Sequence, residues 1–223
     1  GGFVSARILD KLDYDYIASH PKLVVGFSDV TALQTALWEK CRLVTANGPL
    51  MVTLGGSDAY TAGQFFQGLT TDAWQGPLAL PAGRKLTTVV PGQAEGPIVG
   101  GNLTVLTSLV GTPYALDGTG CILVLEDTGE DAYRIDRMLN QLWQSGLLSR
   151  VAAIAYGDFT DCPNDPGDFT TDQVLDYYAH LAGKTAIKGL PVGHTKDKAF
   201  VPYGVKVRLD ADREGASLTF IDV

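Results

Sequence analysis

Three side chains, far apart along the chain, are of the types that nucleophilic catalysis requires: Ser28, Glu126 and His194. A serine hydroxyl is too weakly acidic to attack a carbonyl at neutral pH, so an imidazole must take its proton. A carboxylate then fixes the tautomer of the imidazole and stabilises the imidazolium that forms. The order along the chain, serine then acid then histidine, is also that of the α/β hydrolases. Their convergence in space is a hypothesis that the sequence leaves open.

Ser28 lies where a predicted strand at residues 22–26 gives way to a predicted helix at 29–40. Such a turn can hold a hydroxyl clear of the sheet edge, beside the unpaired N–H groups of a helix N-terminus. The local sequence, Gly-Phe-Ser-Asp, departs from the Gly-x-Ser-x-Gly pattern of α/β hydrolases. A serine here also commonly caps the following helix, and from the turn alone the cap is the better interpretation.

Glu126 follows a run of apolar residues that predicts a buried strand. A carboxylate in that position must be paired, solvated or protonated. Ion pairing with Arg134 or Arg137 on the next predicted helix explains Glu126 as well as a catalytic role does. For the neighbouring Asp127 and Glu130, ion pairing is the better interpretation.

The three histidines of the chain differ in their settings. His20 precedes a proline in a polar stretch, and His180 lies near the end of an amphipathic helix, so both are expected at the surface. His194 follows Leu-Pro-Val-Gly and precedes Thr-Lys-Asp, on a glycine-supported loop of the kind that often carries catalytic residues. An ordinary loop histidine is an equally good interpretation of His194.

The composition is that of an ordinary globular protein of 223 residues with a net charge of −8. This charge argues against binding to nucleic acid or to anionic membranes, which needs clustered lysine and arginine. No stretch approaches about eighteen uncharged apolar residues, so no membrane span is expected. The three widely spaced cysteines form no metal or disulfide pattern and fit a reducing compartment. No glycine-rich phosphate loop follows a strand, which disfavours a flavodoxin-like cofactor binder.

Strand and helix patterns alternate along the chain, which predicts a parallel sheet with covering helices. A stretch rich in proline and glycine, residues 76–96, is the expected domain boundary. Further helices are predicted over 6–16, 61–70, 102–110, 131–146 and 172–181. Further strands are predicted over 43–46, 85–90, 97–99, 121–125 and 151–156, and antiparallel strands over 199–223.

Several short segments follow one another in a recognisable order. They are Gly1-Gly2-Phe3, Gly26-Phe27-Ser28-Asp29, Gly48-Pro49, Gly100-Gly101-Asn102, Gly111-Thr112-Pro113, Leu125-Glu126-Asp127, Tyr133-Arg134-Ile135-Asp136-Arg137 and Gly193-His194. In this order they resemble the L,D-carboxypeptidases of serine peptidase family S66, which include muramoyl-tetrapeptide carboxypeptidases and microcin-C immunity peptidases. Each segment is weak alone, but the ordered set spans essentially the whole chain.

The resemblance implies an α/β protein of two domains. Residues 1–75 would form a flavodoxin-like (class I amidotransferase-like) parallel-sheet domain that carries the nucleophile. This domain is expected to be truncated at its start, since family members have further strands before the glycine pair. Residues 76–95 would be a linker, and residues 96–223 a swivelling β/α domain with the acid and the base. The active site would lie between the two domains.

The resemblance also assigns roles to the residues of the site. Ser28 would be the nucleophile, Glu126 the acid and His194 the base. The backbone amides of Asp29 and Gly2 would hold the oxyanion. Asn102 is a candidate substrate-binding residue.

One departure from the family concerns the loop that carries the second amide. The usual Gly-Gly-Tyr-Gly of this loop reads Gly1-Gly2-Phe3-Val4 here. A branched residue adopts positive φ less readily than glycine does. The geometry of the loop, and with it the second oxyanion donor, therefore depends on the backbone of Val4.

The implied activity is hydrolysis of an L-to-D peptide bond through an acyl-enzyme, which releases a C-terminal D-amino acid from a murein tetrapeptide in cell-wall recycling. It requires no metal and no organic cofactor. The protein is expected to be a cytoplasmic homodimer with a peptide substrate. Two alternatives stay open: hydrolysis of a peptidyl-nucleotide antibiotic, as in microcin-C immunity, and a non-catalytic binding module that retains the fold.

Overall fold

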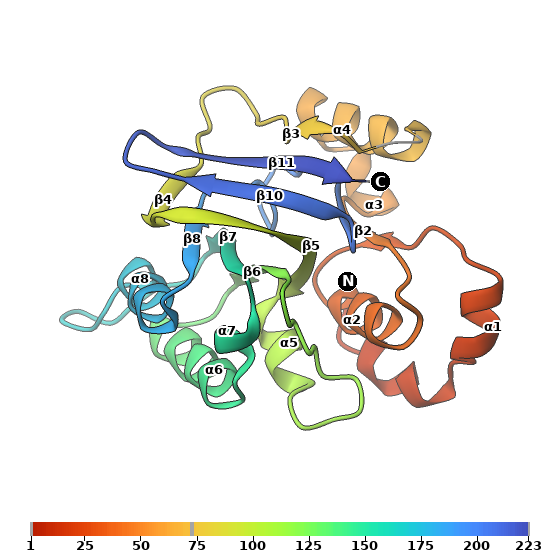
Figure 1. Ribbon diagram of the computed structural model, residues 1–223, viewed down its shortest axis with the longest axis horizontal. Coiled ribbons are helices and arrows are strands. Elements are labelled where there is room, and N and C mark those ends of the chain that lie inside the picture. The colour runs from red at the N-terminus through yellow and green to blue at the C-terminus, as the bar shows by residue number, and fades with distance from the viewer. Residues whose placement is uncertain (1, 72–73, 223) are drawn as a thin grey trace.

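The computed structural model describes residues 2–71 and 74–222 and shows a mixed α/β protein with two sheets (Figure 1). Within these residues the larger sheet has eight strands, in the spatial order β3 (Gly76–Pro77), β11 (Ala216–Asp222), β10 (Lys206–Ala211), β5 (Gly92–Asn102), β6 (Ile122–Thr128), β7 (Ala153–Thr160), β8 (Thr185–Lys188) and β4 (Thr87–Val90). The smaller sheet comprises β1 (Val25–Gly26), β2 (Thr45–Asn47) and β9 (Val201–Tyr203).

The centre of the larger sheet is parallel, because β5, β6, β7 and β8 run in the same direction. Helices make the crossovers: α5 (Leu103–Ser108) follows β5, α6 (Ala132–Gln144) and α7 (Leu147–Arg150) follow β6, and α8 (Thr171–Ala182) follows β7. The strands on either side of this centre pair antiparallel. The architecture is the parallel-sheet α/β fold that the alternating strand and helix patterns predict.

The strand β6 is buried on both faces, which explains its continuous apolar run. Side chains alternate between the two faces of a strand. Leu123 and Leu125 pack in a core cluster with residues of α6 and α8, whereas Ile122 and Val124 pack in a second cluster with residues of β10 and β11. Figure 1 shows the same division, with α5 to α8 below the parallel strands and β10 and β11 above them.

The smaller sheet joins segments from the two ends of the sequence. Strand β1 pairs parallel with β2, and β2 pairs antiparallel with β9. Gly26 and Val201 both pair with Asn47, so the end of β1 and the start of β9 lie at the same edge. Ser28 follows the end of β1, and His194 lies in the segment that leads into the start of β9. Both segments therefore meet the small sheet at the same edge.

The helices around the smaller sheet are α2 (Val30–Cys41), α3 (Met51–Leu54) and α4 (Ala59–Thr70), with a 3₁₀ helix η1 (Ser5–Lys11) and α1 (Tyr14–Ser19) before them. The prediction of one helix over residues 6–16 is therefore wrong. Asp13 has an extended backbone and caps α1, because its carboxylate accepts a hydrogen bond from the Tyr16 N–H. This local cap starts a second, separate helix.

Several predicted strands differ in length from the observed ones, among them the one expected at 97–99, which is part of the longer β5. The strand expected at 22–26 is only the short β1, and the one expected at 43–46 is β2. The run predicted to end at Leu125 continues to Thr128, because Asp127 and Thr128 also pair with β7. Glu126 therefore lies inside β6 and not after it.

The stretch expected to link two domains contributes strands to the larger sheet. Strand β3 pairs with β11, and β4 pairs with β8, at opposite ends of the strand order. The strand predicted over residues 85–90 is confirmed as β4. Among the described residues, no helix is both long enough and apolar enough to cross a lipid bilayer.

Candidate active site

Glu126 and His194 form a close pair at the carboxyl end of the parallel strands. Nδ1 of His194 lies 2.9 Å from Oε2 of Glu126, and the Glu126 side chain is fully buried. Burial raises the pKa of the Glu126 carboxyl, while the hydrogen bond and charge of His194 act in the opposite direction. With Nδ1 engaged by the carboxylate, Nε2 of His194 is the nitrogen left for proton transfer.

A bulge between β6 and β7 aims Glu126 at this histidine. Leu125 pairs with Tyr156 but Asp127 pairs with Phe159, so β7 carries one more residue than β6 across this interval. Bulges of this kind redirect side chains and are common next to active sites. The extra length falls at positions 157–158 of β7, directly opposite Glu126.

Two glycines allow the histidine loop to approach the bulge. Gly193 has a φ of 139°, and a Cβ on it would lie 3.2 Å from Oε2 of Glu126. A Cβ on Gly157 would collide with the backbone carbonyl of Val192. The sequence indicated that glycine supports the His194 loop. The physical reason is that a side chain at either glycine would keep the loop from packing closely against β6 and β7.

Ser28 occupies a strained turn between β1 and α2. Its φ is 64°, a left-handed conformation that non-glycine residues adopt at a cost. The N-cap of α2 is Asp29, and the helix has no side-chain cap hydrogen bond, so the interpretation of Ser28 as a capping residue is wrong. A strained strand-to-helix turn that presents a serine is also the geometry of hydrolase nucleophiles.

The carboxylate of Asp29 fastens the N-terminal loop to this turn. Its Oδ2 accepts hydrogen bonds from the Val4 N–H, the Ser5 N–H and the Ser5 hydroxyl, at 3.2, 3.0 and 2.6 Å. Gly2 has a φ of 125°, and a Cβ on it would lie 3.9 Å from the same oxygen. The loop that was expected to supply the second oxyanion donor thus lies beside the Ser28 turn.

Val4, which replaces a family glycine, does not need a positive φ in this loop. Val4 has a φ of −121°, an ordinary value for a branched residue. The positive φ falls on Gly2, where glycine is retained. Gly1 lies outside the described residues.

Two further side chains connect the serine turn with the histidine loop. The ring of Phe27 lies 5.0 Å from the His194 ring, centroid to centroid. Nζ of Lys198 lies 5.1 Å from the Phe27 centroid and donates a hydrogen bond to the carbonyl of Thr195. Burial lowers the pKa of the Lys198 amine. Among the described contacts, no hydrogen bond joins the Ser28 hydroxyl to His194.

Asn102 lies next to the acid, since it pairs with Glu126 in the register of β5 and β6. Its Nδ2 donates to Asp127 at 2.8 Å, and its Oδ1 accepts the Val105 N–H and so caps α5. The other oxygen of Asp127 accepts the N–H and hydroxyl of Thr104. Asn102 is therefore buried, and its amide also lowers the pKa of the Glu126 carboxyl, against the larger effect of burial.

Ion pairing with arginine does not explain the acidic residues of β6. Glu126 pairs with His194, and Asp127 is held by neutral donors, so that interpretation is wrong for both. It is confirmed for Glu130, whose Oε2 lies 3.7 Å from Nη1 of Arg134 on α6. His20 and His180 lie at the surface, as expected.

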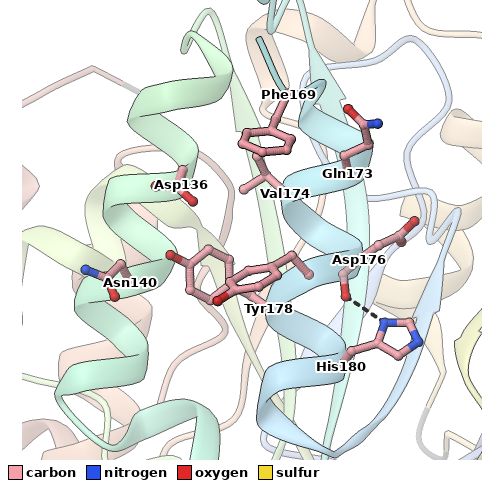
Figure 2. A pocket seen from close by; sticks show the side chains of 9 residues that line it. Asp136, Asn140, Phe169, Gln173, Val174, Asp176, Tyr178 and His180 are labelled. Carbon is pink, nitrogen blue, oxygen red and sulfur yellow. Dashed lines mark hydrogen bonds between the residues drawn. The ribbon is translucent and has the colours of Figure 1, made fainter.

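A hollow of about 750 Å³ lies away from this pair, between α6 and α8 (Figure 2). Phe169, Tyr177 and Tyr178 line it together with Asp136 and His180. Nδ1 of His180 lies 2.8 Å from the carbonyl of Asp176 on its own helix, and Figure 2 shows it turned toward that residue. The lining of this hollow includes none of Ser28, Glu126 and His194.

Comparison with known proteins identifies the family. The chain matches the model of the LD-carboxypeptidase N-terminal domain over residues 1–48 and that of the LD-carboxypeptidase C-terminal domain over residues 95–209. The chain belongs to the LD-carboxypeptidase family. Within the described residues, no group of three or more histidine, cysteine, aspartate or glutamate side chains is arranged to hold a metal ion.

Relatives within the LD-carboxypeptidase family match over nearly the whole chain. The chain is 38% identical to the probable murein peptide carboxypeptidase of Bacillus subtilis, over 97% of its length and 68% of that relative. It is 29% identical to the microcin C7 self-immunity protein MccF of Escherichia coli, over 98% of its length and 72% of that protein. The crystal structure of muramoyltetrapeptide carboxypeptidase from Oxalobacter formigenes superimposes with a TM-score of 0.84 at 31% identity, covering all of this chain and 76% of that one.

Proposed function

We propose that this protein is a serine peptidase that cleaves an L-to-D peptide bond and releases the C-terminal D-amino acid of a murein tetrapeptide. The observation that carries the proposal is the pair of Glu126 and His194, 2.9 Å apart, at the edge where the strained Ser28 turn emerges. Relatives that are named murein peptide carboxypeptidases support the substrate class.

In this mechanism Ser28 attacks the carbonyl of the scissile bond, and Nε2 of His194 takes the hydroxyl proton. His194 then gives that proton to the leaving amine of the D-amino acid. Glu126 holds the imidazole and stabilises its charged form while the proton is there. A water molecule, activated by the same histidine, hydrolyses the acyl-enzyme and regenerates Ser28.

The oxyanion of the tetrahedral intermediate is held by the backbone amides of Asp29 and Gly2. The first belongs to the N-terminus of α2, and the second to the loop that the Asp29 carboxylate fastens beside it. Each such donor is typically worth about 3 kcal/mol in the transition state. Asn102, which pairs with Glu126 in the register of β5 and β6, is proposed to help bind the substrate. We further propose a cytoplasmic homodimer, which rests on the family resemblance.

A second candidate function is hydrolysis of a peptidyl-nucleotide antibiotic. The similarity to the microcin C7 self-immunity protein MccF supports it, and the same three side chains would serve. The higher identity to the murein peptide carboxypeptidase of Bacillus subtilis favours the tetrapeptide as the principal substrate.

Mass spectrometry of the reaction with L-Ala-γ-D-Glu-meso-diaminopimelyl-D-Ala tests the proposal. We expect loss of one D-alanine in the wild type and none in Ser28→Ala. A fluorophosphonate probe should label the wild type at Ser28. A folded protein that neither labels nor turns over the tetrapeptide would be a binding module. Turnover of an aminoacyl-sulfamoyl adenosine alone would select the antibiotic-hydrolase function.

A further inference from the structure

The segment that carries His194 has no regular secondary structure of its own. Residues 189–200, between β8 and β9, contain neither helix nor strand. Backbone hydrogen bonds with β7 hold the start of this segment, at Leu190 and Val192, but none of those bonds reaches His194 itself, so side chains must add to its support. The hydroxyl of Thr61 bonds the segment after the histidine, at Lys196 and Lys198. The side chains that bind the segment before His194 and directly after it belong to two residues that the sequence did not single out, Arg84 and Asp158.

Arg84, in the loop between β3 and β4, binds the start of the segment. Its Nε donates to the carbonyl of Gly189 at 2.7 Å, and its Nη2 donates to the carbonyl of Leu190 at 2.8 Å. Nη2 also lies 2.7 Å from Oδ1 of Asp158, and the two side chains are only 18% and 22% exposed. A planar guanidinium is suited to hold three acceptors at once.

Asp158, at the bulge of β7, holds the segment on both sides of His194. Its backbone N–H donates to the carbonyl of Val192 at 2.8 Å, before the histidine. Its Oδ2 accepts the hydroxyl of Thr195 at 2.9 Å, directly after the histidine. Glu126 lies opposite the same bulge on the neighbouring strand. The proposed acid, Glu126, and Asp158 are therefore both positioned by this one irregularity of the sheet.

We propose that Arg84 and Asp158 are positioning residues that hold His194 against Glu126. Arg84 fixes the carboxylate of Asp158 and the start of the segment, and Asp158 binds Val192 before the histidine and Thr195 after it. The inference rests on the proposed function for the role of His194 as base. Neither side chain is assigned contact with the substrate, so both act through the geometry of the histidine.

The test compares Arg84→Lys and Thr195→Val with the control Lys188→Gln. Lys188 is a cation of similar exposure, 20%, and pairs at 2.9 and 2.7 Å with Asp172 and Asp176 of α8. Arg84→Lys keeps the positive charge but loses the planar guanidinium that donates to three acceptors. Thr195→Val removes the hydroxyl that lies 2.9 Å from Oδ2 of Asp158 and 3.1 Å from the carbonyl of Asp197. Both changes are conservative, so we expect both variants to fold. A thermal unfolding midpoint close to that of the wild type verifies this.

Two readouts separate positioning from a merely structural role. We expect kcat for D-alanine release to fall on the order of tenfold to a hundredfold in Arg84→Lys and Thr195→Val, with KM within about twofold of the wild type. We also expect the downfield proton resonance of His194 Nδ1, bonded to Glu126, to broaden or shift in both variants. Lys188→Gln should keep both the resonance and kcat.

The resonance does not depend on turnover, so the two proposals can fail separately. A wild type with the resonance and no peptidase activity would overturn the proposed function, and loss of the resonance in Arg84→Lys would still support the positioning role. Wild-type resonance and wild-type kcat in both variants would overturn the inference. An equal fall in kcat and an equal change of the resonance in Lys188→Gln would also overturn the inference.

Discussion

The imidazole of His194 packs edge-on against the ring of Phe27, with centroids 5.0 Å apart and ring planes at 65°. Phe27 is buried and directly precedes Ser28, so this contact ties the proposed base to the turn of the proposed nucleophile. Edge-to-face aromatic pairs have a preferred geometry that aliphatic contacts lack. The orientation of the imidazole toward Ser28 therefore depends on the Phe27 ring.

We expect Phe27→Leu to lower kcat for D-alanine release about tenfold, because a small displacement of the base is costly. Leucine retains most of the buried volume, so the free energy of unfolding should fall by only about 1 kcal/mol. Steady-state kinetics and urea denaturation measure the two effects. Phe66→Leu, at a phenylalanine that is 59% exposed, is the control and should change neither. An unchanged kcat in Phe27→Leu would contradict the orienting role.

The sequence predicted the ingredients of the site but not their support. Ser28, Glu126 and His194 could be selected from residue types, chain order and family resemblance. Phe27, Arg84 and the other supporting residues act through contacts across long sequence separations, such as the 74 positions between Arg84 and Asp158. No local pattern reports such contacts. The glycines at 157 and 193 were the available signal, since each marks a close approach of two segments.

The predicted elements were reliable where one physical pattern dominated. The helix of residues 131–146 has a single apolar face and was placed within two residues of α6. The end of β6 was missed, because Glu126 and Asp127 are polar and their place in the strand depends on pairing with β7 and on His194. The tertiary contacts of a functional site thus override the local signal at that point.

The carboxylate of Asp29 offers a test of the N-terminal loop. Asp29→Asn weakens the three hydrogen bonds that hold Val4 and Ser5, and we expect the loop with Gly2 to move away from the Ser28 turn. The rate of acylation by a fluorophosphonate probe should fall about tenfold, since one oxyanion donor is displaced. Asp13→Asn, at the exposed cap of α1, is the matched control. Equal labelling rates for both variants would exclude an oxyanion role for this loop.

The buried Glu126 predicts a specific dependence of stability on pH. Its pKa in the folded protein is raised above the ordinary value of 4.5, mainly by burial, so the folded state binds more protons there than the unfolded state. The contribution of Glu126 to stability should therefore be present below pH 4.5 and decline as the pH rises through its folded pKa. Urea denaturation from pH 4 to pH 7 should show this decline in the wild type relative to Glu126→Gln. Parallel curves for the two proteins would contradict it.

The strain at Ser28 predicts that stability and activity change in opposite directions. Its φ of 64° costs free energy that glycine would not incur, so Ser28→Gly should unfold at a free energy about 1 kcal/mol higher, while activity is lost. Ser28→Ala should lose activity without this gain, because alanine keeps the strain. Asp161→Gly relieves a similar φ of 52° in an exposed turn after β7 and should gain stability with activity unchanged. If Ser28→Gly proved no more stable than Ser28→Ala, as judged by urea denaturation, the turn would not be strained. A serine held there at a cost to the fold is what a nucleophile requires, because the same backbone conformation presents its hydroxyl to the substrate.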